Sequence, residues 1–291
     1  MHFELLTDQH LDICRPYFEL LSYPTCDYTV GGVFMWRDLY DIEFAADEEA
    51  LFIRYHEEGG DIYYGLPIFK DVSAGIAKLI AHEKEQGNNI IRFCAIPAEY
   101  TPCFEGLRVV NSYPQTEYFD YLYAAEDLIN LSGKKFGGQR NLISQFGRLY
   151  PDGKFEVLNE GNLDEVREFF DSFSSADLNE DKNAENDLVH QVLEKEGLYG
   201  MFGGVLYAEG KVAGFSVGEI VGDTLYVHIE KADRNVKGAY QTLNNRFAAH
   251  FGKGVQFINR EDDTGDLGLR KAKLAYHPIR LLEKFVFEIE I

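Results

Sequence analysis

The densest group of charged and polar side chains in this 291-residue chain lies between Asn259 and Tyr276. It opens with an Arg–Glu–Asp–Asp run and continues with an arginine and a lysine three positions apart, on one face of a predicted helix. Such cations beside carboxylates suit a zwitterion, for example an amino acid or an aminoacyl group. The other interpretation is a salt-bridge network that holds the loop in place. The residues expected to orient a substrate are Asn259, Arg260, Glu261, Asp262, Arg270 and Lys273.

A second candidate pair, His228 and Glu230, lies two positions apart in a segment that is typical of a β-strand. Alternate residues of a strand point to the same face, so we expect both side chains on one face of a sheet. There Glu230 can act as a general base toward an attacking amine, and His228 can contact the substrate. The alternative is that Glu230 forms an ion pair with Lys231, Arg234 or a cation of a neighbouring strand.

The elements that must position these residues fill the second half of the chain. Hydrophobic periodicity predicts helices near 163–175 and 185–196, strands at 200–208, 211–220 and 223–231, a helix over 237–251, a strand at 255–259, a helix over 267–275 and a last strand at 284–290. With the strand that begins at Phe155, the order is strand, two helices, antiparallel meander, helix, strand, helix, strand. This is the element order of the acetyltransferase fold.

That fold holds donor phosphates in the loop before the helix at 237–251, where backbone N–H groups and the helix dipole attract anions. Arg234, Gly238 and Ala239 are the residues expected to bind the donor there. The usual coenzyme A pattern, counted from Arg234, requires glycine at position 237, where this chain has lysine. Coenzyme A, another anionic donor and a plain helix cap therefore all stay open. Tyr276 follows the helix at 267–275, near the place where this fold keeps a tyrosine that protonates the leaving group.

The two halves of the chain share a pattern at an offset of 152 residues. Residues 3–18 and 155–170 are identical at seven aligned positions, and both segments predict a short strand, a polar cap and an amphipathic helix. We therefore predict an N-terminal acetyltransferase-like domain at 1–130, a connecting helix within 131–152 and a C-terminal acetyltransferase-like domain at 153–291. The predicted fold class is α+β, with mixed, mostly antiparallel sheets flanked by helices.

Four segments resemble one known family: residues 131–141, 228–233, 238–244 and, most specifically, 259–278. The family is the bacterial group of uncharacterised proteins related to the C-terminal domain of phosphatidylglycerol lysyltransferases, and the resemblance covers nearly the whole chain. It implies a tandem acetyltransferase-like (GNAT) fold, distantly similar to the Fem-type aminoacyl transferases. Those relatives move an aminoacyl group from tRNA to an amine or a lipid hydroxyl. The resemblance leaves the substrate of this chain open.

The composition limits the partners of the protein. The chain has 28 Lys and Arg against 49 Asp and Glu, a net charge of −21, with −12 on residues 1–145 and −9 on the remainder. A polyanion must therefore meet a local basic patch, for which 134–148 and 270–284 are the candidates. Because no apolar run reaches the ~18–20 residues of a membrane helix and no signal peptide is recognisable, we expect a cytoplasmic protein without a transmembrane segment. The four cysteines lack CxxC spacing and predict reduced thiols.

Two motifs are set aside. The segment Gly214–Gly218 fits the G-x-S-x-G pattern of hydrolases, but Ser216 lies inside a predicted hairpin strand rather than at a strand-to-helix turn. Three aspartates, Asp262, Asp263 and Asp266, lack the spacing of a calcium loop, and no metal site is expected.

The sequence as a whole predicts an acyltransferase or aminoacyltransferase whose chemistry lies in the second half. The donor would be aminoacyl-tRNA or acyl-coenzyme A, bound as a substrate and not as a permanent cofactor. The acceptor would be a small molecule or a lipid headgroup that offers an amine or a hydroxyl, and tRNA is a possible partner. The alternative is a non-catalytic ligand-sensing or interaction module on the same fold.

Overall fold

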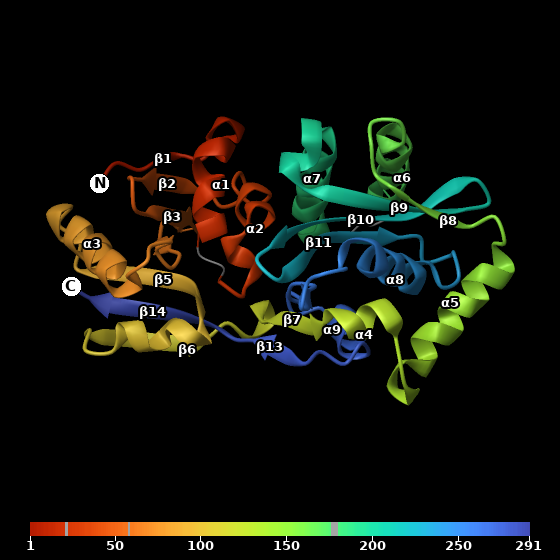
Figure 1. Ribbon diagram of the computed structural model, residues 1–291. Helices are drawn as coiled ribbons and strands as arrows, with labels where there is room; N and C mark the ends of the chain where they lie inside the picture. Colours follow the sequence, from red (N-terminus) through yellow and green to blue (C-terminus); the bar gives the residue numbers. More distant parts are fainter. Residues whose placement is uncertain (21–22, 58, 176–179) are drawn as a thin grey trace. The chain divides into compact units, whose positions relative to one another are not determined.

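The computed structural model describes residues 1–20, 23–57, 59–175 and 180–291, and within them the chain forms two seven-stranded sheets flanked by helices (Figure 1). Two compact units result. The first contains Met1–Asp120, Asp262–Asp266 and Leu281–Ile291, and the second contains Tyr121–Glu261 and Leu267–Arg280. The α+β class with mixed, mostly antiparallel sheets is confirmed. None of the helices in the described ranges combines the length and the apolar character that a membrane span needs.

The sheet of the first unit has the strand order β1-β2-β3-β4-β5-β14-β6. Its strands are β1 (Glu4–Leu5), β2 (Glu43–Ala46), β3 (Leu51–His56), β4 (Ile62–Tyr64), β5 (Ile90–Pro97), β14 (Lys284–Glu290) and β6 (Val109–Pro114). The helices are α1 (Leu11–Leu20), α2 (Val30–Phe34) and α3 (Val72–Glu85). β4 and β5 pair in parallel, and the other strand pairs of this sheet run antiparallel.

The sheet of the second unit has the order β8-β9-β10-β11-β12-β7-β13. Its strands are β8 (Lys154–Val157), β9 (Phe202–Ala208), β10 (Lys211–Val221), β11 (Thr224–Ala232), β12 (Phe257–Asn259), β7 (Asp120–Ala124) and β13 (Arg280–Leu282). The helices are α4 (Ala125–Asn130), α5 (Gly137–Leu149), α6 (Leu163–Ser175), α7 (Glu180–Glu194), α8 (Ala239–Phe251) and α9 (Leu267–Leu274). Here β11 and β12 pair in parallel.

The same succession of elements occurs in both units. Each begins with an edge strand, continues through two helices and a three-stranded meander, and then adds a helix and a strand parallel to the last strand of the meander. The edge strands β1 and β8, each followed by a helix, are the two segments that match at an offset of 152 residues. The predicted acetyltransferase order is therefore present twice as far as this parallel strand, and each element predicted for the second half of the chain is found, with its last strand, β14, in the first sheet.

The sixth position of each sheet is filled by a strand from a distant part of the chain. β14, the last strand, lies between β5 and β6 in the first sheet, whereas β7 lies between β12 and β13 in the second. The predicted bounds of 1–130, 131–152 and 153–291 therefore do not match the compact units, and α5 belongs to the second unit instead of connecting two domains. Periodicity predicts that a segment is a strand, but contacts with distant segments decide its partner.

A buried ion cluster lies where the chain passes between the two sheets. The Nζ atom of Lys284, at the start of β14, lies 2.7 Å from a carboxylate oxygen of Asp27 and 2.7 Å from one of Asp120, at the start of β7. It also lies 3.6 Å from the Sγ atom of Cys26. Cys26, Asp27 and Asp120 are close enough together to share a metal ion, but the ammonium group of Lys284 already lies between the two carboxylates. The cysteines of the chain are free thiols, as predicted.

The beginning of α8 depends on a glycine. Leu243, Phe247 and Ala248 recur at helical spacing and are buried in the core of the second unit. Gly238 precedes the helix with φ = 80°, in the left-handed region that favours glycine. A Cβ atom at this position would collide with the carbonyl oxygen of Leu142 in α5. Gly238 therefore lets α5 pack closely against the start of α8.

We expect Gly238→Ala to lower the free energy of unfolding by about 3 kcal/mol or more, because it adds a steric collision to backbone strain. Gly210→Ala is the matched control, since Gly210 has φ = 71° with open space around it. This control should cost about 1–2 kcal/mol from strain alone. Urea denaturation of both variants measures the difference, and equal losses would contradict the packing role of Gly238.

Candidate functional site

β10 and β11 carry the central residues of the candidate site, and a β-bulge decides which face each one occupies. Glu230 lies opposite Ser216, but the register shifts after Val217 and leaves His228 as an extra residue in β11. One extra residue reverses the alternation of side chains beyond it. His228 and Glu230 therefore face opposite sides of the sheet, and the prediction that they share a face is wrong.

On the face that packs against α8, Glu230 forms a buried ion pair with Arg260. Its Oε1 atom lies 2.7 Å from Nη2 of Arg260, and its Oε2 atom accepts a hydrogen bond of 3.0 Å from Nδ2 of Asn244 in α8. Both side chains of the ion pair are nearly nine-tenths buried. The partner of Glu230 is therefore Arg260, a cation next to the neighbouring strand β12. Lys231, another partner considered for Glu230, pairs with Glu185 instead.

The guanidinium group of Arg260 also lies against two tyrosines. Its central carbon is 4.8 Å from the ring centroid of Tyr276 and 5.8 Å from that of Tyr123. Burial raises the pKa of the Tyr276 phenol above its usual value, although the charge of Arg260 lowers it. Tyr276 is therefore protonated at neutral pH and can donate a hydrogen bond or a proton, as the acid of a transfer reaction must.

Three buried polar atoms around this ion pair have no hydrogen-bond partner among the described residues. They are Nη1 of Arg260, Oδ1 of Asn244 and Oγ of Ser216, the residue opposite Glu230. Buried polar groups are normally hydrogen-bonded, because leaving one unsatisfied costs ~1–3 kcal/mol. Together with Glu230 they present acceptors for an ammonium group and one free N–H for an oxygen. We call these four residues and Tyr276 the Glu230 cluster.

On the opposite face, His228 lies between two carboxylates. Its Nδ1 atom is 2.7 Å from Glu261 and its Nε2 atom is 3.0 Å from Glu219 in β10. Burial alone would lower the pKa of His228, but the hydrogen bonds and charges of the two glutamates raise it to about 10. His228 is therefore an imidazolium ion at neutral pH, which excludes it as a general base.

Both ion pairs cross the gap that opens between β11 and β12. The two parallel strands pair only as far as Tyr226 and Asn259, although β11 continues to Ala232. Beyond that point Arg260 reaches Glu230 on one face, and Glu261 reaches His228 on the other. Ligands of open α/β sheets bind beyond the carboxyl ends of strands, and this strand end is such a position.

Three N–H groups in the loop before α8 and at its start are already hydrogen-bonded. The N–H groups of Asn235 and Val236 both donate to Asp233, and that of Ala239 donates to the carbonyl of Val236. The guanidinium of Arg234 is exposed, and the space next to Gly238 is filled by α5. The geometry favours the helix-cap interpretation over a cradle for coenzyme A phosphates.

The other predicted substrate residues separate. Lys273 lies under the site with its ammonium 2.5 Å from the carbonyl oxygen of Arg260, and Asn259 is buried and accepts a hydrogen bond from the N–H of Glu261. Arg270 lies half-buried on α9. Asp262 belongs to the first unit. The sequence prediction did not include Ser216, Glu219 and Asn244 in the site. Strand pairing brings Ser216 and Glu219 there, and the packing of α8 brings Asn244, and no local sequence signal shows either contact.

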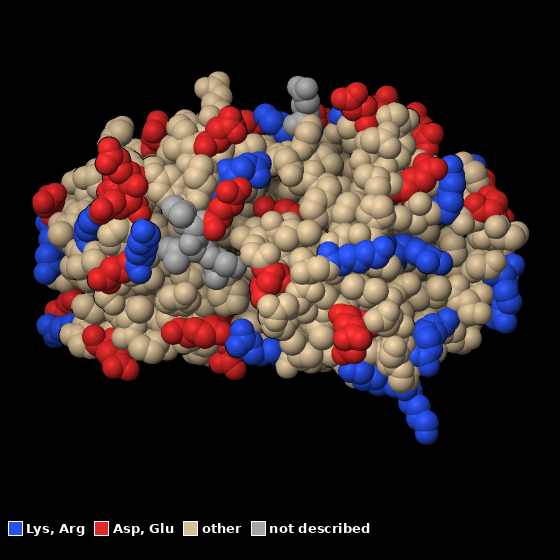
Figure 2. Space-filling model, in the orientation of Figure 1, with Lys and Arg blue, Asp and Glu red and all other residues tan. Residues whose placement is uncertain are grey.

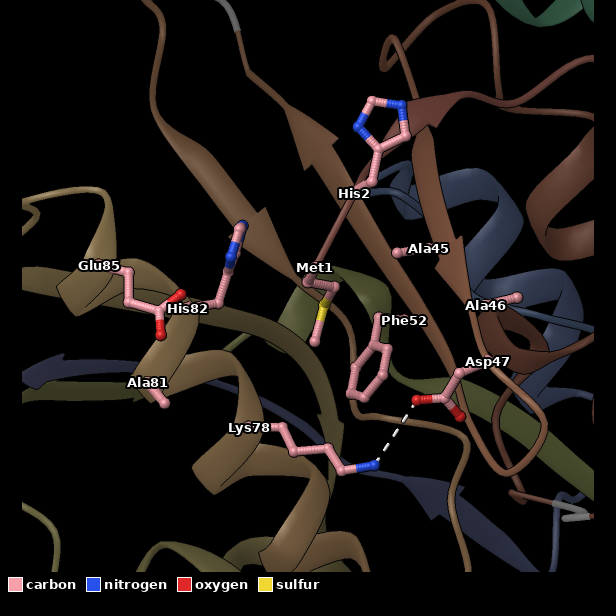
Figure 3. Close-up of a pocket in the computed structure, with 10 residues that line it drawn as sticks. All are labelled: Met1, His2, Ala45, Ala46, Asp47, Phe52, Lys78, Ala81, His82 and Glu85. Carbon is pink, nitrogen blue, oxygen red and sulfur yellow. Dashed lines mark ion pairs between the residues drawn. The ribbon is translucent and has the colours of Figure 1, made fainter.

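The first unit has a hollow of about 450 Å³ between α3 and the β2–β3 strands (Figure 3). An ion pair on its wall joins Lys78 and Asp47 at 3.6 Å, and the side chain of Met1 extends into the hollow (Figure 3). Burial lowers the pKa of His82 on its wall. None of the residues predicted to do chemistry lines this hollow, so the Glu230 cluster stays the stronger candidate.

Comparisons with known proteins agree with this fold. The family profile described as "Phosphatidylglycerol lysyltransferase, C-terminal" matches residues 18–288. An uncharacterised protein of Mycoplasmoides gallisepticum is 23% identical over 176 residues, and the match spans 58% of this chain but only 56% of that relative. A conserved protein of unknown function from Bacteroides thetaiotaomicron is similar with a TM-score of 0.89 and 28% identity over 99% of both chains. L-PGS from Bacillus licheniformis is similar with a TM-score of 0.69 and 16% identity, over 98% of this chain and 92% of that one.

The pKa of His228 predicts how stability changes with pH. Because the pKa is about 10 in the folded protein against 6.5 when unperturbed, its contribution is complete below pH 6.5 and is lost as the pH rises toward 10. The free energy of unfolding should fall by up to ~1.4 kcal/mol per pH unit in this window. Glu219→Gln removes one of the two charges and should flatten the slope. Urea denaturation at several pH values tests this, with Glu156→Gln, in an exposed ion pair, as the control; a slope unchanged by Glu219→Gln would contradict it.

Proposed function

Since the chain belongs to the family of the phosphatidylglycerol lysyltransferase C-terminal domain, we propose that it transfers an aminoacyl group from tRNA to an amine or hydroxyl acceptor, with lipid headgroups among the acceptors. The observation that carries this proposal is the set of unsatisfied polar atoms in the Glu230 cluster. The chemistry is assigned to the second unit, where that cluster lies.

The Glu230 cluster matches the two polar ends of an aminoacyl ester. Its α-ammonium group needs acceptors, which the carboxylate of Glu230, Oγ of Ser216 and Oδ1 of Asn244 supply. Its carbonyl oxygen needs a donor, which Nη1 of Arg260 supplies. A charged donor in a buried site stabilises the negative charge that develops on this oxygen during acyl transfer.

The transfer step in this proposal uses two further properties of the site. Tyr276 stays protonated and donates its proton to the oxygen that leaves the acyl carbon. The attacking amine or hydroxyl displaces Nη2 of Arg260 from Oε1 of Glu230, which accepts its proton, while Nη1 stays available to the carbonyl oxygen. The bond between the acyl carbon and the tRNA oxygen breaks as the bond to the acceptor forms.

Aminoacyl-tRNA is favoured over acyl-coenzyme A by the loop before α8. The N–H groups of Asn235, Val236 and Ala239 are already hydrogen-bonded and α5 packs on Gly238, which makes this helix end less suited to a pyrophosphate. The departure of Lys237 from the coenzyme A pattern agrees with this geometry.

The charge distribution also supports a tRNA donor. The first unit has 9 Lys and Arg against 27 Asp and Glu, whereas the second has 19 against 22, so the acidity of the chain is concentrated away from the candidate site. No Asp or Glu occurs in residues 128–151 or 234–260, which contain α5 and α8. Figure 2 shows Lys and Arg side chains over these two helices. Such a surface suits the phosphates of an RNA.

The alternative, a ligand-sensing module, draws on one observation. One carboxylate oxygen of Glu230 is bonded to Arg260 and the other to Asn244, so neither is free to accept a proton. This arrangement suits a sensor, which needs no general base. A sensor would bind an amino acid or aminoacyl analogue in the Glu230 cluster without turnover. Activity measurements therefore separate the two functions.

Tyr276→Phe should lower kcat for aminoacyl transfer by about 10²–10⁴-fold while the protein stays folded, because it removes the proposed proton donor. The assay follows labelled amino acid from charged tRNA to phosphatidylglycerol vesicles or to a soluble amine. Tyr207→Phe, which changes another buried tyrosine of the second unit, is the control and should keep full activity. A folded wild-type protein that binds aminoacyl analogues without any turnover would support the sensor.

The double variant Arg148→Glu and Arg246→Glu, in α5 and α8, should weaken tRNA binding at least about tenfold at moderate salt and reduce its salt dependence. Both side chains are exposed, so folding should not change. Arg108→Glu, an exposed arginine of the first unit, is the control. Filter binding over a series of salt concentrations measures both effects, and an unchanged affinity would place the tRNA surface elsewhere.

A further inference from the structure

Helix α9 is oriented against the usual rule of amphipathic helices. Leu267 and Leu274 are 74% and 46% exposed, whereas the buried residue of this helix is Lys273, which is 7% exposed. Burial of a leucine is favourable and burial of a lysine is costly, so the opposite orientation is expected. The exposed side of α9 is therefore more apolar than the side that packs on the protein.

The contacts of Lys273 explain why this residue, and not Leu267 or Leu274, packs against the protein. Its ammonium group donates to the carbonyl oxygen of Arg260 and lies 5.8 Å from the ring centroid of Tyr121. The hydroxyl of Tyr123 donates to the backbone carbonyl of Lys273. The inner face of α9 is thus fixed by the candidate site. Leu267, Lys271 and Leu274, at spacings of four and three, share the outer face.

The outer face itself carries cations and no acids. Lys271 and Arg280 are exposed, and residues 267–282 contain no Asp or Glu, although Asp266 and Glu283 flank this stretch. The loop that follows α9 exposes Ile279, which is 51% exposed, and Arg280. On its other side, His277 lies 3.2 Å from the carbonyl oxygen of Lys135, so the exposed Lys134 and Lys135 are neighbours of this surface.

We propose that the surface formed by the outer face of α9 and by residues 277–280 docks on an anionic lipid bilayer. The apolar side chains of Leu267, Leu274 and Ile279 enter the interface, while Lys271 and Arg280 meet lipid phosphates. A bilayer fits better than RNA, because RNA offers no environment for exposed leucines. It also fits better than a second copy of the chain, because a two-fold contact would set the same cations against each other.

This inference does not depend on the transfer reaction, because docking is measured without any donor. Vesicles of phosphatidylcholine alone and vesicles enriched in phosphatidylglycerol are incubated with the full chain and sedimented. The wild type should bind the anionic vesicles, and high salt should weaken binding. Leu267→Ser with Leu274→Ser should lower the partition coefficient at least about tenfold. Ile220→Ser, at another exposed apolar residue of the second unit, is the matched control and should bind like the wild type.

Three outcomes would overturn the proposal. The wild type would fail to bind vesicles of either composition, or the double variant would bind as well as the wild type. In the third case, light scattering would show a dimer for the wild type and a monomer for the double variant, which would assign the surface to a second copy. Loss of transfer activity with normal vesicle binding would contradict the proposed function but leave this docking surface intact.

Discussion

The buried ion cluster of Lys284 is the interaction on which the architecture depends. The ammonium group is 1% exposed and lies between the carboxylates of Asp27 and Asp120. Asp120 begins β7, by which the chain enters the second sheet, and Lys284 begins β14, which returns to the first. A buried ion pair contributes little net stability, but breaking it by removing one partner costs ~3–5 kcal/mol. The cluster therefore stabilises the starts of β7 and β14, where the chain leaves the first unit and re-enters it.

The exchange of strands decides what lies around the candidate site. β7 brings Tyr121 and Tyr123 next to β12, and their rings and hydroxyl groups support Arg260 and Lys273. The bulge in β11 then places Glu230 and His228 on opposite faces of the sheet. One ion pair on each face crosses the gap between β11 and β12. Breaking either ion pair would leave a buried charge without its partner. This cost keeps the site rigid when no ligand is bound.

Charge follows the compact units and not the halves of the sequence. Residues 262–266 and 281–291 carry acidic residues into the first unit, which leaves the second nearly balanced. Most of the net charge of −21 lies on the first unit. It therefore argues less strongly against an RNA partner of the second unit. The same distribution leaves α9 and its neighbours both cationic and apolar on their outer side.

The sequence by itself determined the elements and the chemical inventory of this protein. Periodicity, turn residues and the internal repeat predicted the strands and helices around the site, because these signals are local. Composition and motif singled out Arg260, Glu230 and Tyr276, and the structure shows that Arg260 contacts the other two. Only the tertiary structure decided the domain bounds, the separation of His228 from Glu230 and the roles of Ser216, Glu219 and Asn244. Strand partners, a one-residue bulge and helix packing set these features, and each depends on contacts between segments far apart in the sequence.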